Sequence, residues 1–293
     1  MELSVLIVNY NAEAHLRNCL LSLFEHTEIW PLEVIVVDNA SSDSSLAILA
    51  REFPAVQVVA SPENLGFSRA NNVAMRAARG QYFLLLNNDT VVKPRAVDVM
   101  LRIMKERPDV GVLGPLLRNE DGSVQISYGR MISLHAEMWQ KFLRKRYDAG
   151  DRFFRRYVEA RSRRVAYPDW VSGACLMLRA DILARVGLLD ENFFMYTEEV
   201  DLCHRIRGLG YKVLYTPEAE IVHLGGKSTE SNADKAAYEY RRSQLYFYRK
   251  HYGPHHVRIL KAYLVTKIAL ALALGRPERR EFRRSLLKLV WDF

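Results

Sequence analysis

The sequence predicts an α/β fold built on a largely parallel sheet, and two observations carry that prediction. In the first 90 residues, short apolar runs alternate with segments whose apolar residues recur at helical spacing. Strands that alternate with helices of about 10–15 residues indicate parallel βαβ units. The chain of 293 residues is also long enough for one large domain of this kind or for two ordinary ones.

The expected elements follow this alternation along the chain. Leu16, Leu20 and Leu23 recur at helical spacing, and the capping residues Ser41 and Ser42 precede the second helix. The expected strands are Leu3–Asn9, Glu33–Asp38, Val56–Ala60, Tyr82–Asn87, Val110–Leu113, Trp170–Leu178, Val213–Thr216 and Glu220–His223. The expected helices are Ala12–His26, Ser42–Phe53, Phe67–Arg79, a helix after Pro94 to about Arg107, Arg179–Val186 and Thr197–Gly208. The stretch 116–165 is less regular, and from about Ala236 the chain becomes helical and basic.

Composition excludes several classes of protein. Hydrophobic residues make up 49% and charged residues 26% of the chain, which fits a folded protein and not a disordered or collagen-like one. The three cysteines are odd in number and widely spaced, so they indicate neither a disulfide framework nor a zinc site. A strand begins near the first residue without a basic leader, and no apolar run reaches the ~18 residues of a spanning helix. We therefore expect a reduced, cytoplasmic protein.

The net charge of +8 is unevenly distributed. Residues 241–293 hold 13 Lys and Arg against three acids, and residues 141–164 hold 10 against three, which leaves an acidic body. Within the tail, the apolar run Tyr263–Leu274 is only 12 residues long and lies beside bases. Such a segment suits either a helix in the membrane interface or a helical pair packed on the protein or on another subunit.

Polar clusters directly follow three of the expected strands. They are Asn9-Tyr10-Asn11, Asp38-Asn39 and Asn87-Asn88-Asp89. Parallel sheets bind ligands at the carboxyl ends of their strands, so we expect these clusters to meet at a ligand site. Taken alone, each has a second interpretation: Asp89 belongs either to a turn or to a Mg²⁺ or Mn²⁺ site, and Asp38 either caps a helix or binds a ribose hydroxyl.

Two further segments are ambiguous in the same way. The acids in Glu198-Glu199-Val200-Asp201 suit a helix N-terminus, although three acids after the aromatic run FFMY exceed what capping needs. His223 is either a packed histidine or a ligand, and the Gly-Gly-Lys-Ser run after it resembles an anion loop.

Seven blocks, in order and at the right spacing, resemble the family 2 glycosyltransferases of the GT-A fold, and most of all their rhamnosyltransferase-like branch. The resemblance covers roughly residues 3–230. It implies a Rossmann-like mixed sheet flanked by helices as a catalytic domain over residues 1–235, followed by a basic amphipathic helical extension over residues 236–293. The blocks are NYN, VDNASSDSS, NLGFSRANN, LLLNNDT, WVSGACLMLRA, GLLDENFFMYTEEVDLCHRIRGLGYK and IVHLGGKS.

The resemblance assigns a nucleotide pocket to the N-terminal blocks. It implies that Tyr10 and Asp38 hold the base and ribose, that Asn64 and Asn71 line the nucleotide pocket, and that Asn88 contacts the substrate. The expected donor is a dTDP- or UDP-linked sugar.

The resemblance also implies a divalent cation, Mg²⁺ or Mn²⁺, on the donor diphosphate. Asp89 and His223 would hold it, with Lys227 and Ser228 near the phosphates. The family often has Asp where this chain has Asn87, which argues against coordination of the cation by two carboxylates.

The acid pair carries the expected chemistry. Glu199 falls on the family's general-base position, with Glu198 as the other candidate, and Trp170 and Gly173 would form the floor beneath donor and acceptor. One base opposite the leaving diphosphate gives a single displacement with inversion, whereas a hydrolase would use two carboxyls. The resemblance therefore implies transfer of rhamnose or another hexose to a glycan or lipid-linked acceptor in cell-surface polysaccharide synthesis.

Two alternative functions are also considered, together with contacts to nucleic acid, to a membrane and to a second copy of the chain. A nucleotidyltransferase would need a glycine-rich basic loop after the first strand, and a non-catalytic sugar-nucleotide-binding homologue would explain the departures at Asn87 and Glu199. Nucleic acid is not expected, because the bases lie outside the α/β core. Peripheral contact with an anionic membrane on the inner face of the cell membrane and a homodimer are left open.

Overall fold

The computed structural model describes residues 1–28, 31–225, 233–274 and 279–293. Its strands are β1 Leu3–Asn9, β2 Leu32–Asp38, β3 Gln57–Ala60, β4 Tyr82–Leu86, β5 Thr90–Val92, β6 Val110–Arg118, β7 Val124–Gln125, β8 Tyr128–Gly129, β9 Trp170–Val171, β10 Cys175–Arg179 and β11 Lys212–His223. Its helices are α1 Glu13–His26, α2 Ser45–Glu52, α3 Gly66–Ala77, α4 Ala96–Glu106, α5 Leu134–Asp148, α6 Arg152–Ser162, α7 Ala180–Val186, α8 Glu198–Gly208, α10 Ala233–His251, α11 Pro254–Leu274 and α12 Arg280–Asp292.

One mixed sheet organises the first 225 residues. Its strand order is β3-β2-β1-β4-β10-β6-β11-β5, with β7 paired to β6. The first four strands are parallel, β10 runs antiparallel to both of its neighbours, and β11 is parallel to β6. The carboxyl ends of β1, β2, β4, β6 and β11 therefore share one edge of the sheet, where a ligand site is expected.

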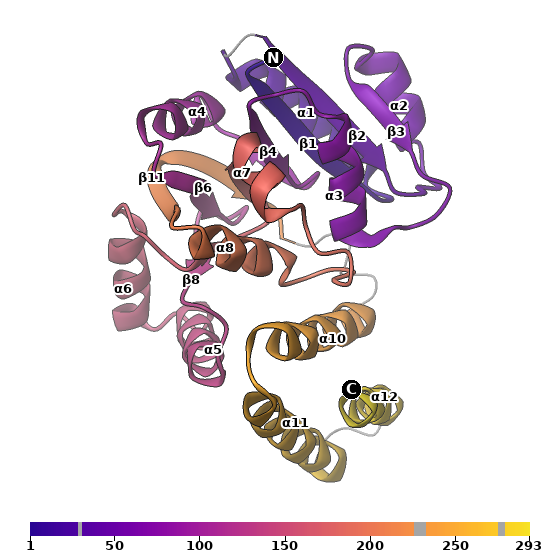
Figure 1. The fold of residues 1–293 in the computed structure, drawn as a ribbon, viewed down its shortest axis with the longest axis vertical. Helices are drawn as coiled ribbons and strands as arrows, with labels where there is room; N and C mark the ends of the chain where they lie inside the picture. The colour runs from indigo at the N-terminus through magenta and orange to yellow at the C-terminus, as the bar shows by residue number, and fades with distance from the viewer. Residues whose placement is uncertain (29–30, 226–232, 275–278) are drawn as a thin grey trace.

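Alternation along each strand places its side chains on two covered faces. In β1, Val5 and Ile7 pack with α1 and α4 on one face, whereas Leu6 packs with α3, α7 and α8 on the other. Residues of both faces are almost fully buried, as in a sheet covered by helices on both sides. The sheet edge described above is thus held on a rigid three-layer body (Figure 1).

The C-terminal helices α10, α11 and α12 pack together and against the rest of the chain. Leu245 of α10, Leu264 of α11 and Val290 of α12 share a buried cluster with Phe193 and Val200. These helices lie at the opposite end of the molecule from β1–β3 (Figure 1). Of the two sequence-based interpretations of the tail, the packed helical arrangement is the one seen.

Several expected elements differ from the structure. The expected strand Trp170–Leu178 is two strands, because β9 pairs with β8 in a separate small sheet and β10 joins the main one. The two short strands expected over 213–223 are the single strand β11, whose pairing with β6 is irregular between Thr216 and Glu220. The stretch expected to be irregular, 116–165, contains β7, β8, α5 and α6.

Candidate functional site

The polar clusters after β1, β2 and β4 meet at the sheet edge, as the sequence predicts. Asn9 is fully buried, and its side-chain oxygen accepts a hydrogen bond of 2.8 Å from the amide of Asn88. Its amide nitrogen donates to the hydroxyl of Ser41 at 3.2 Å. Asp38 is also buried, and its carboxylate accepts from the backbone N–H of Ser41 at 3.1 Å. Tyr10 lies beside them and is 40% exposed, so its ring is available to a ligand.

The loop before α3 is tied to this edge by two asparagines. The side-chain oxygen of Asn39 accepts from the backbone N–H of Leu65 at 2.7 Å, and its amide donates to Asn64 at 3.0 Å. Asn64 in turn accepts from the backbone N–H of Gly66 at 2.9 Å. Asn64 is exposed and at the same time braces this turn.

Polar side chains of α3 bond both to the helix itself and to a later loop. Asn71 is buried and donates to the carbonyl oxygen of Phe67 at 3.0 Å, one helical turn earlier. Asn72 exchanges two hydrogen bonds with the backbone of Leu189, at 2.8 and 3.0 Å. Asn72 thus fastens α3 to the segment that leads to the acid pair.

Strand pairing brings Asp89 and His223 together. Thr90 at the start of β5 is paired with His223 at the end of β11. The His223 Nε2 atom lies 3.2 Å from a carboxylate oxygen of Asp89, and both side chains are largely buried. The His223 Nδ1 atom lies 2.7 Å from the side-chain oxygen of Gln125, which can only accept, so Nδ1 carries the proton. The Nε2 atom faces Asp89, so the two side chains can bind the same metal ion.

This donor set fits a hard divalent cation that also binds the oxygens of a substrate. A carboxylate oxygen and a neutral imidazole nitrogen are both common ligands of Mn²⁺, and Mg²⁺ and Mn²⁺ accept phosphate oxygens as further ligands. Asn87 lies beside the pair, with its amide nitrogen 3.5 Å from His223 Nε2. Among the described residues, no group of three His, Cys, Asp or Glu side chains could hold a metal. Lys227 and Ser228 lie outside the described residues.

The acid pair opens α8, and its two carboxyls differ. Glu198 is 5% exposed; burial, followed by the charge of Glu199, raises the pKa of its carboxyl well above the usual range. Burial also raises the pKa of Glu199, to about 6, but backbone N–H groups, among them that of Gly173, limit the rise. Of the two carboxyls, Glu199 is therefore the one that loses its proton more readily as the pH approaches neutrality.

Glu199 lines a cavity whose lining does not include Glu198. The cavity has a volume of about 290 Å³, and Trp170, Tyr196 and Tyr240 also line it. The Trp170 ring is held by a 2.8 Å hydrogen bond from its Nε1 to the carbonyl oxygen of Arg130. A Cβ atom added to Gly173 would lie 3.5 Å from the Glu199 Cβ, so this glycine packs directly against the base candidate.

The backbone before the acid pair is strained. Tyr196 and Thr197 have φ values of 71° and 66°, a left-handed conformation that is unusual for bulky and β-branched residues. Ser243 of α10 donates a 2.7 Å hydrogen bond to the carbonyl oxygen of Met195, directly before them. Helix α10 therefore helps to hold the loop that positions Glu199.

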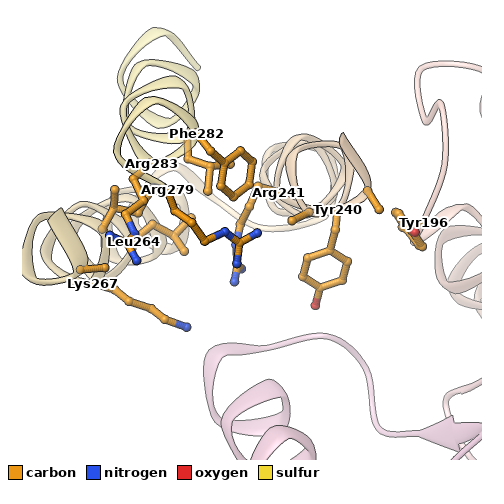
Figure 2. Close-up of a pocket in the computed structure, with 13 residues that line it drawn as sticks. Tyr196, Tyr240, Arg241, Leu264, Lys267, Arg279, Phe282 and Arg283 are labelled. Atoms are coloured by element: carbon orange, nitrogen blue, oxygen red, sulfur yellow. The ribbon is translucent and has the colours of Figure 1, made fainter. Parts of the chain in front are cut away.

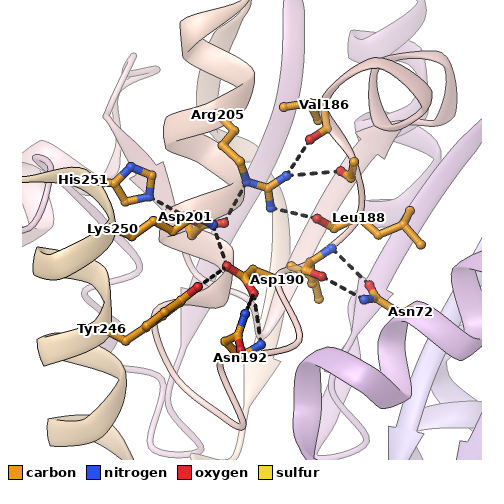
Figure 3. A network of polar contacts seen from close by, with 12 residues as sticks. Asn72, Val186, Leu188, Asp190, Asn192, Asp201, Arg205, Tyr246, Lys250 and His251 are labelled. Atoms are coloured by element: carbon orange, nitrogen blue, oxygen red, sulfur yellow. Dashed lines mark hydrogen bonds and ion pairs between the residues drawn. The ribbon is translucent and has the colours of Figure 1, made fainter. Parts of the chain in front are cut away.

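Asp201, the third acid, has a structural role at the same helix start. It is fully buried and bonded to Arg205 at 2.7 Å, to Lys250 at 2.7 Å and to His251 at 2.6 Å (Figure 3). Lys250 also reaches Asp190, at 2.7 Å. This network joins α8 to α10.

Asn9 and Asn39 belong to the predicted polar clusters, although the sequence analysis assigns neither an individual role. Other residues escaped the sequence-based prediction altogether. Gln125 lies 98 residues from His223 and carries no motif, so only the structure reveals it. Tyr240 and Ser243 belong to the helical extension, where no sequence pattern indicates a link to the site.

Comparisons with known proteins agree with this geometry. The sequence model of "Glycosyl transferase family 2" matches residues 4–167. The N-acetylglucosaminyl-diphospho-decaprenol L-rhamnosyltransferase of Mycobacterium tuberculosis is 31% identical, over 98% of this chain and 97% of its own. Rhamnosyltransferase WbbL of Escherichia coli is 23% identical over 79% of this chain and 87% of its own. The mannosyltransferase PcManGT of Pyrobaculum calidifontis, solved with GDP-Man and Mn²⁺, superposes with a TM-score of 0.59 at 17% identity, over 99% of this chain and 84% of that one. The predicted GT-A fold class, a mixed sheet with flanking helices and a helical C-terminus, is confirmed.

Proposed function

Because this chain belongs to glycosyl transferase family 2, it is a glycosyltransferase, and we propose that it transfers L-rhamnose to a lipid-linked N-acetylglucosamine. The relative that matches almost the whole of both chains has that activity in its name. The donor would be a dTDP- or UDP-linked sugar. The observation that carries the proposal is the position of the Glu199 carboxyl at the wall of the 290 Å³ cavity.

In the proposed reaction Glu199 is the general base. It takes the proton of the acceptor hydroxyl while that oxygen bonds to the anomeric carbon of the donor sugar. The bond from this carbon to the diphosphate oxygen breaks, and its electron pair leaves with the diphosphate. A single displacement of this kind inverts the anomeric configuration. Glu198 is the weaker candidate, because burial and the charge of Glu199 raise its pKa well above the usual range and it is not among the residues that line this cavity.

The leaving diphosphate would lie near Asp89 and His223. When bound there, Mg²⁺ or Mn²⁺ supplies positive charge to the departing phosphates. Asp89 supplies a carboxylate oxygen, and Gln125 orients His223 so that Nε2 faces the same space. Asn87 brings no second carboxylate, so the cation would depend on the substrate for its remaining ligands. Lys227 and Ser228 are proposed to contact the phosphates.

The nucleotide would occupy the carboxyl ends of β1, β2 and β4. Tyr10 is exposed enough to contact a base, and Asp38 lies at the end of the neighbouring strand. Asn64, Asn71 and Asn88 already bond to protein groups, which supports a role in shaping this pocket. Trp170 and Gly173 would form the floor between donor and acceptor.

We further propose peripheral contact with the cytoplasmic face of the cell membrane. Among the described residues, none of the helices has the length and apolarity needed to cross a membrane. Large apolar side chains of α5, α11 and α12 are nevertheless exposed. Trp139 of α5 is 50% exposed, Leu274 of α11 is 85% exposed and Trp291 of α12 is 76% exposed. Exposed aromatic and apolar side chains on amphipathic helices bind at membrane interfaces. Homodimerisation and the division into residues 1–235 and 236–293 remain predictions.

An assay with a panel of donors tests the proposed function. The protein is mixed with dTDP-, UDP- or GDP-sugars, Mn²⁺ and a short-chain prenyl-diphospho-N-acetylglucosamine. We expect release of nucleoside diphosphate together with a new disaccharide of inverted anomeric configuration. Donor binding without any transfer would favour the non-catalytic homologue, and formation of a sugar nucleotide from a sugar phosphate would favour a nucleotidyltransferase.

A further inference from the structure

A second cavity lies between the three C-terminal helices. It has a volume of about 570 Å³, and residues of α10, α11 and α12 line it (Figure 2). Four of these residues are cationic: Arg241, Lys267, Arg279 and Arg283. The apolar residues of its wall include Leu264, Ile268, Phe282 and Leu286. An apolar wall beside a group of cations suits a ligand with an anionic head and a hydrocarbon chain.

The charges in this cavity are arranged close together. The head groups of Arg241 and Arg279 point into the same space as the amine of Lys267 (Figure 2). Arg241 donates to the neutral amide oxygen of Gln244 at 2.5 Å, and Arg279 forms an ion pair with Asp234. Partial desolvation, and then the charge of Arg241, lower the pKa of Lys267. An anion bound between these groups would relieve their repulsion.

The two cavities are adjacent. Tyr196 and Tyr240 line both the 570 Å³ cavity and the 290 Å³ cavity that contains Glu199. In an acceptor whose reacting sugar is attached directly to a diphosphate, the diphosphate must lie about one sugar ring from the base. Tyr196 and Tyr240 lie at the boundary between the two cavities, with Glu199 on one side and the cations on the other. This arrangement matches the order of sugar and diphosphate in the acceptor.

We propose that this cavity binds the prenyl diphosphate of the acceptor. The cations Arg241, Lys267 and Arg279 contact the diphosphate, and Leu264 and Phe282 pack against the first isoprene units. The sugar then lies in the smaller cavity beside Glu199. This inference rests on the proposed lipid-linked acceptor, and it gives the basic C-terminal helices a role in acceptor recognition.

Binding of farnesyl diphosphate tests the proposal without catalysis. The full chain is titrated with farnesyl diphosphate in the presence of saturating dTDP and Mn²⁺, which keep the probe out of the donor pocket. The test variant is Lys267→Gln with Arg279→Gln, and the control is Arg258→Gln with Lys288→Gln, two exposed bases on the same helices. We expect the test variant to weaken binding at least about tenfold, because it removes two charge-assisted contacts, and the control to bind as wild type does.

Two further ligands separate this site from general attraction to anions. Inorganic diphosphate should bind more weakly than farnesyl diphosphate because it lacks the chain, and phosphatidylglycerol vesicles should bind the test and control variants alike. Equal loss of farnesyl diphosphate binding in both variants, or a loss of vesicle binding confined to the test variant, would overturn the proposal. Unchanged circular dichroism and melting temperature confirm that each variant is folded.

A kinetic measurement separates this inference from the proposed function. The test variant should raise the KM for prenyl-diphospho-N-acetylglucosamine about tenfold or more, while transfer to an octyl N-acetylglucosaminide stays within about twofold of wild type. An equal effect on both acceptors would contradict diphosphate recognition here. Failure of wild-type protein to use either acceptor, with farnesyl diphosphate binding intact, would reject the proposed acceptor sugar and not this cavity.

Discussion

Replacing Asp201 by asparagine should weaken the junction between α8 and α10. The carboxylate is fully buried and is bonded to Arg205, Lys250 and His251 (Figure 3). Burial alone would raise its pKa, but the hydrogen bond from His251 and the charges of Arg205 and Lys250 outweigh burial and lower it. The Asp201→Asn side chain keeps the shape and one acceptor oxygen but lacks the charge that compensates these groups.

The expected loss in the free energy of unfolding is at the lower end of the range for a broken buried ion pair. Removing one partner of such a pair costs about 3–5 kcal/mol. Arg205 keeps its hydrogen bonds to the carbonyl oxygens of Val186 and Leu188, each 2.8 Å, and Lys250 keeps Asp190. We therefore expect a loss of about 3 kcal/mol, which at about 2 °C per kcal/mol lowers the melting temperature by roughly 6 °C.

Urea unfolding at pH 7, followed by circular dichroism, measures this loss. Asp181→Asn makes the same chemical change in a surface pair, where the carboxylate is 69% exposed, and should cost under about 0.5 kcal/mol. Because the folded-state pKa of Asp201 is lowered, its contribution is present above the unfolded pKa of about 3.9 and is lost as pH falls through the folded value. A loss at pH 7 no larger than that of Asp181→Asn would refute this account of the junction.

Three other changes test separate parts of the site. Asp89→Ala should abolish the increase in nucleoside diphosphate affinity that Mn²⁺ produces, as measured by titration with and without metal. If the variant shows the same increase as the wild type, Asp89 does not bind the metal and serves only in the turn. Gly66→Ala should lower both stability, by about 1–2 kcal/mol, and turnover, because φ is +76° and the new Cβ would lie 2.5 Å from the Phe194 carbonyl oxygen. Gly122→Ala, with φ +78° and no atom within 4 Å of its Cβ, should lower stability only. Since the pKa of Glu199 is about 6, kcat/KM should fall about tenfold per pH unit below 6, and a flat profile down to about pH 5 would contradict an ionised base.

The sequence was sufficient for the fold from β1 to β4. There each strand and helix is a local pattern: Val5 and Ile7 alternate with Leu6, and Leu16 and Leu20 recur at helical spacing. The later strands depend on partners distant in sequence. The antiparallel β10 lies between β4 and β6, and a pattern of apolar residues does not specify strand direction.

The sequence could indicate Asp89 and His223 as candidates because one follows a strand closely and the other ends one. Their proximity follows from the β5–β11 pairing, which local sequence does not reveal. The same limit hid Gln125, whose contact with His223 spans 98 residues. The contact of the loop before Tyr196 with Ser243 involves a distant helix, so nothing near FFMY signals it.

Turnover and donor affinity of Glu199→Gln test the central claim most directly. Loss of a general base lowers turnover by about 10²–10⁴-fold, whereas the amide keeps the shape of the cavity wall and should leave the donor dissociation constant nearly unchanged. Glu198→Gln is the matched control and should retain most of its turnover, because Glu198 does not line the cavity and its pKa is raised well above the usual range by burial and by the charge of Glu199. An active Glu199→Gln enzyme beside an inactive Glu198→Gln enzyme would contradict the assignment of the base, and near-normal turnover in both would contradict the mechanism.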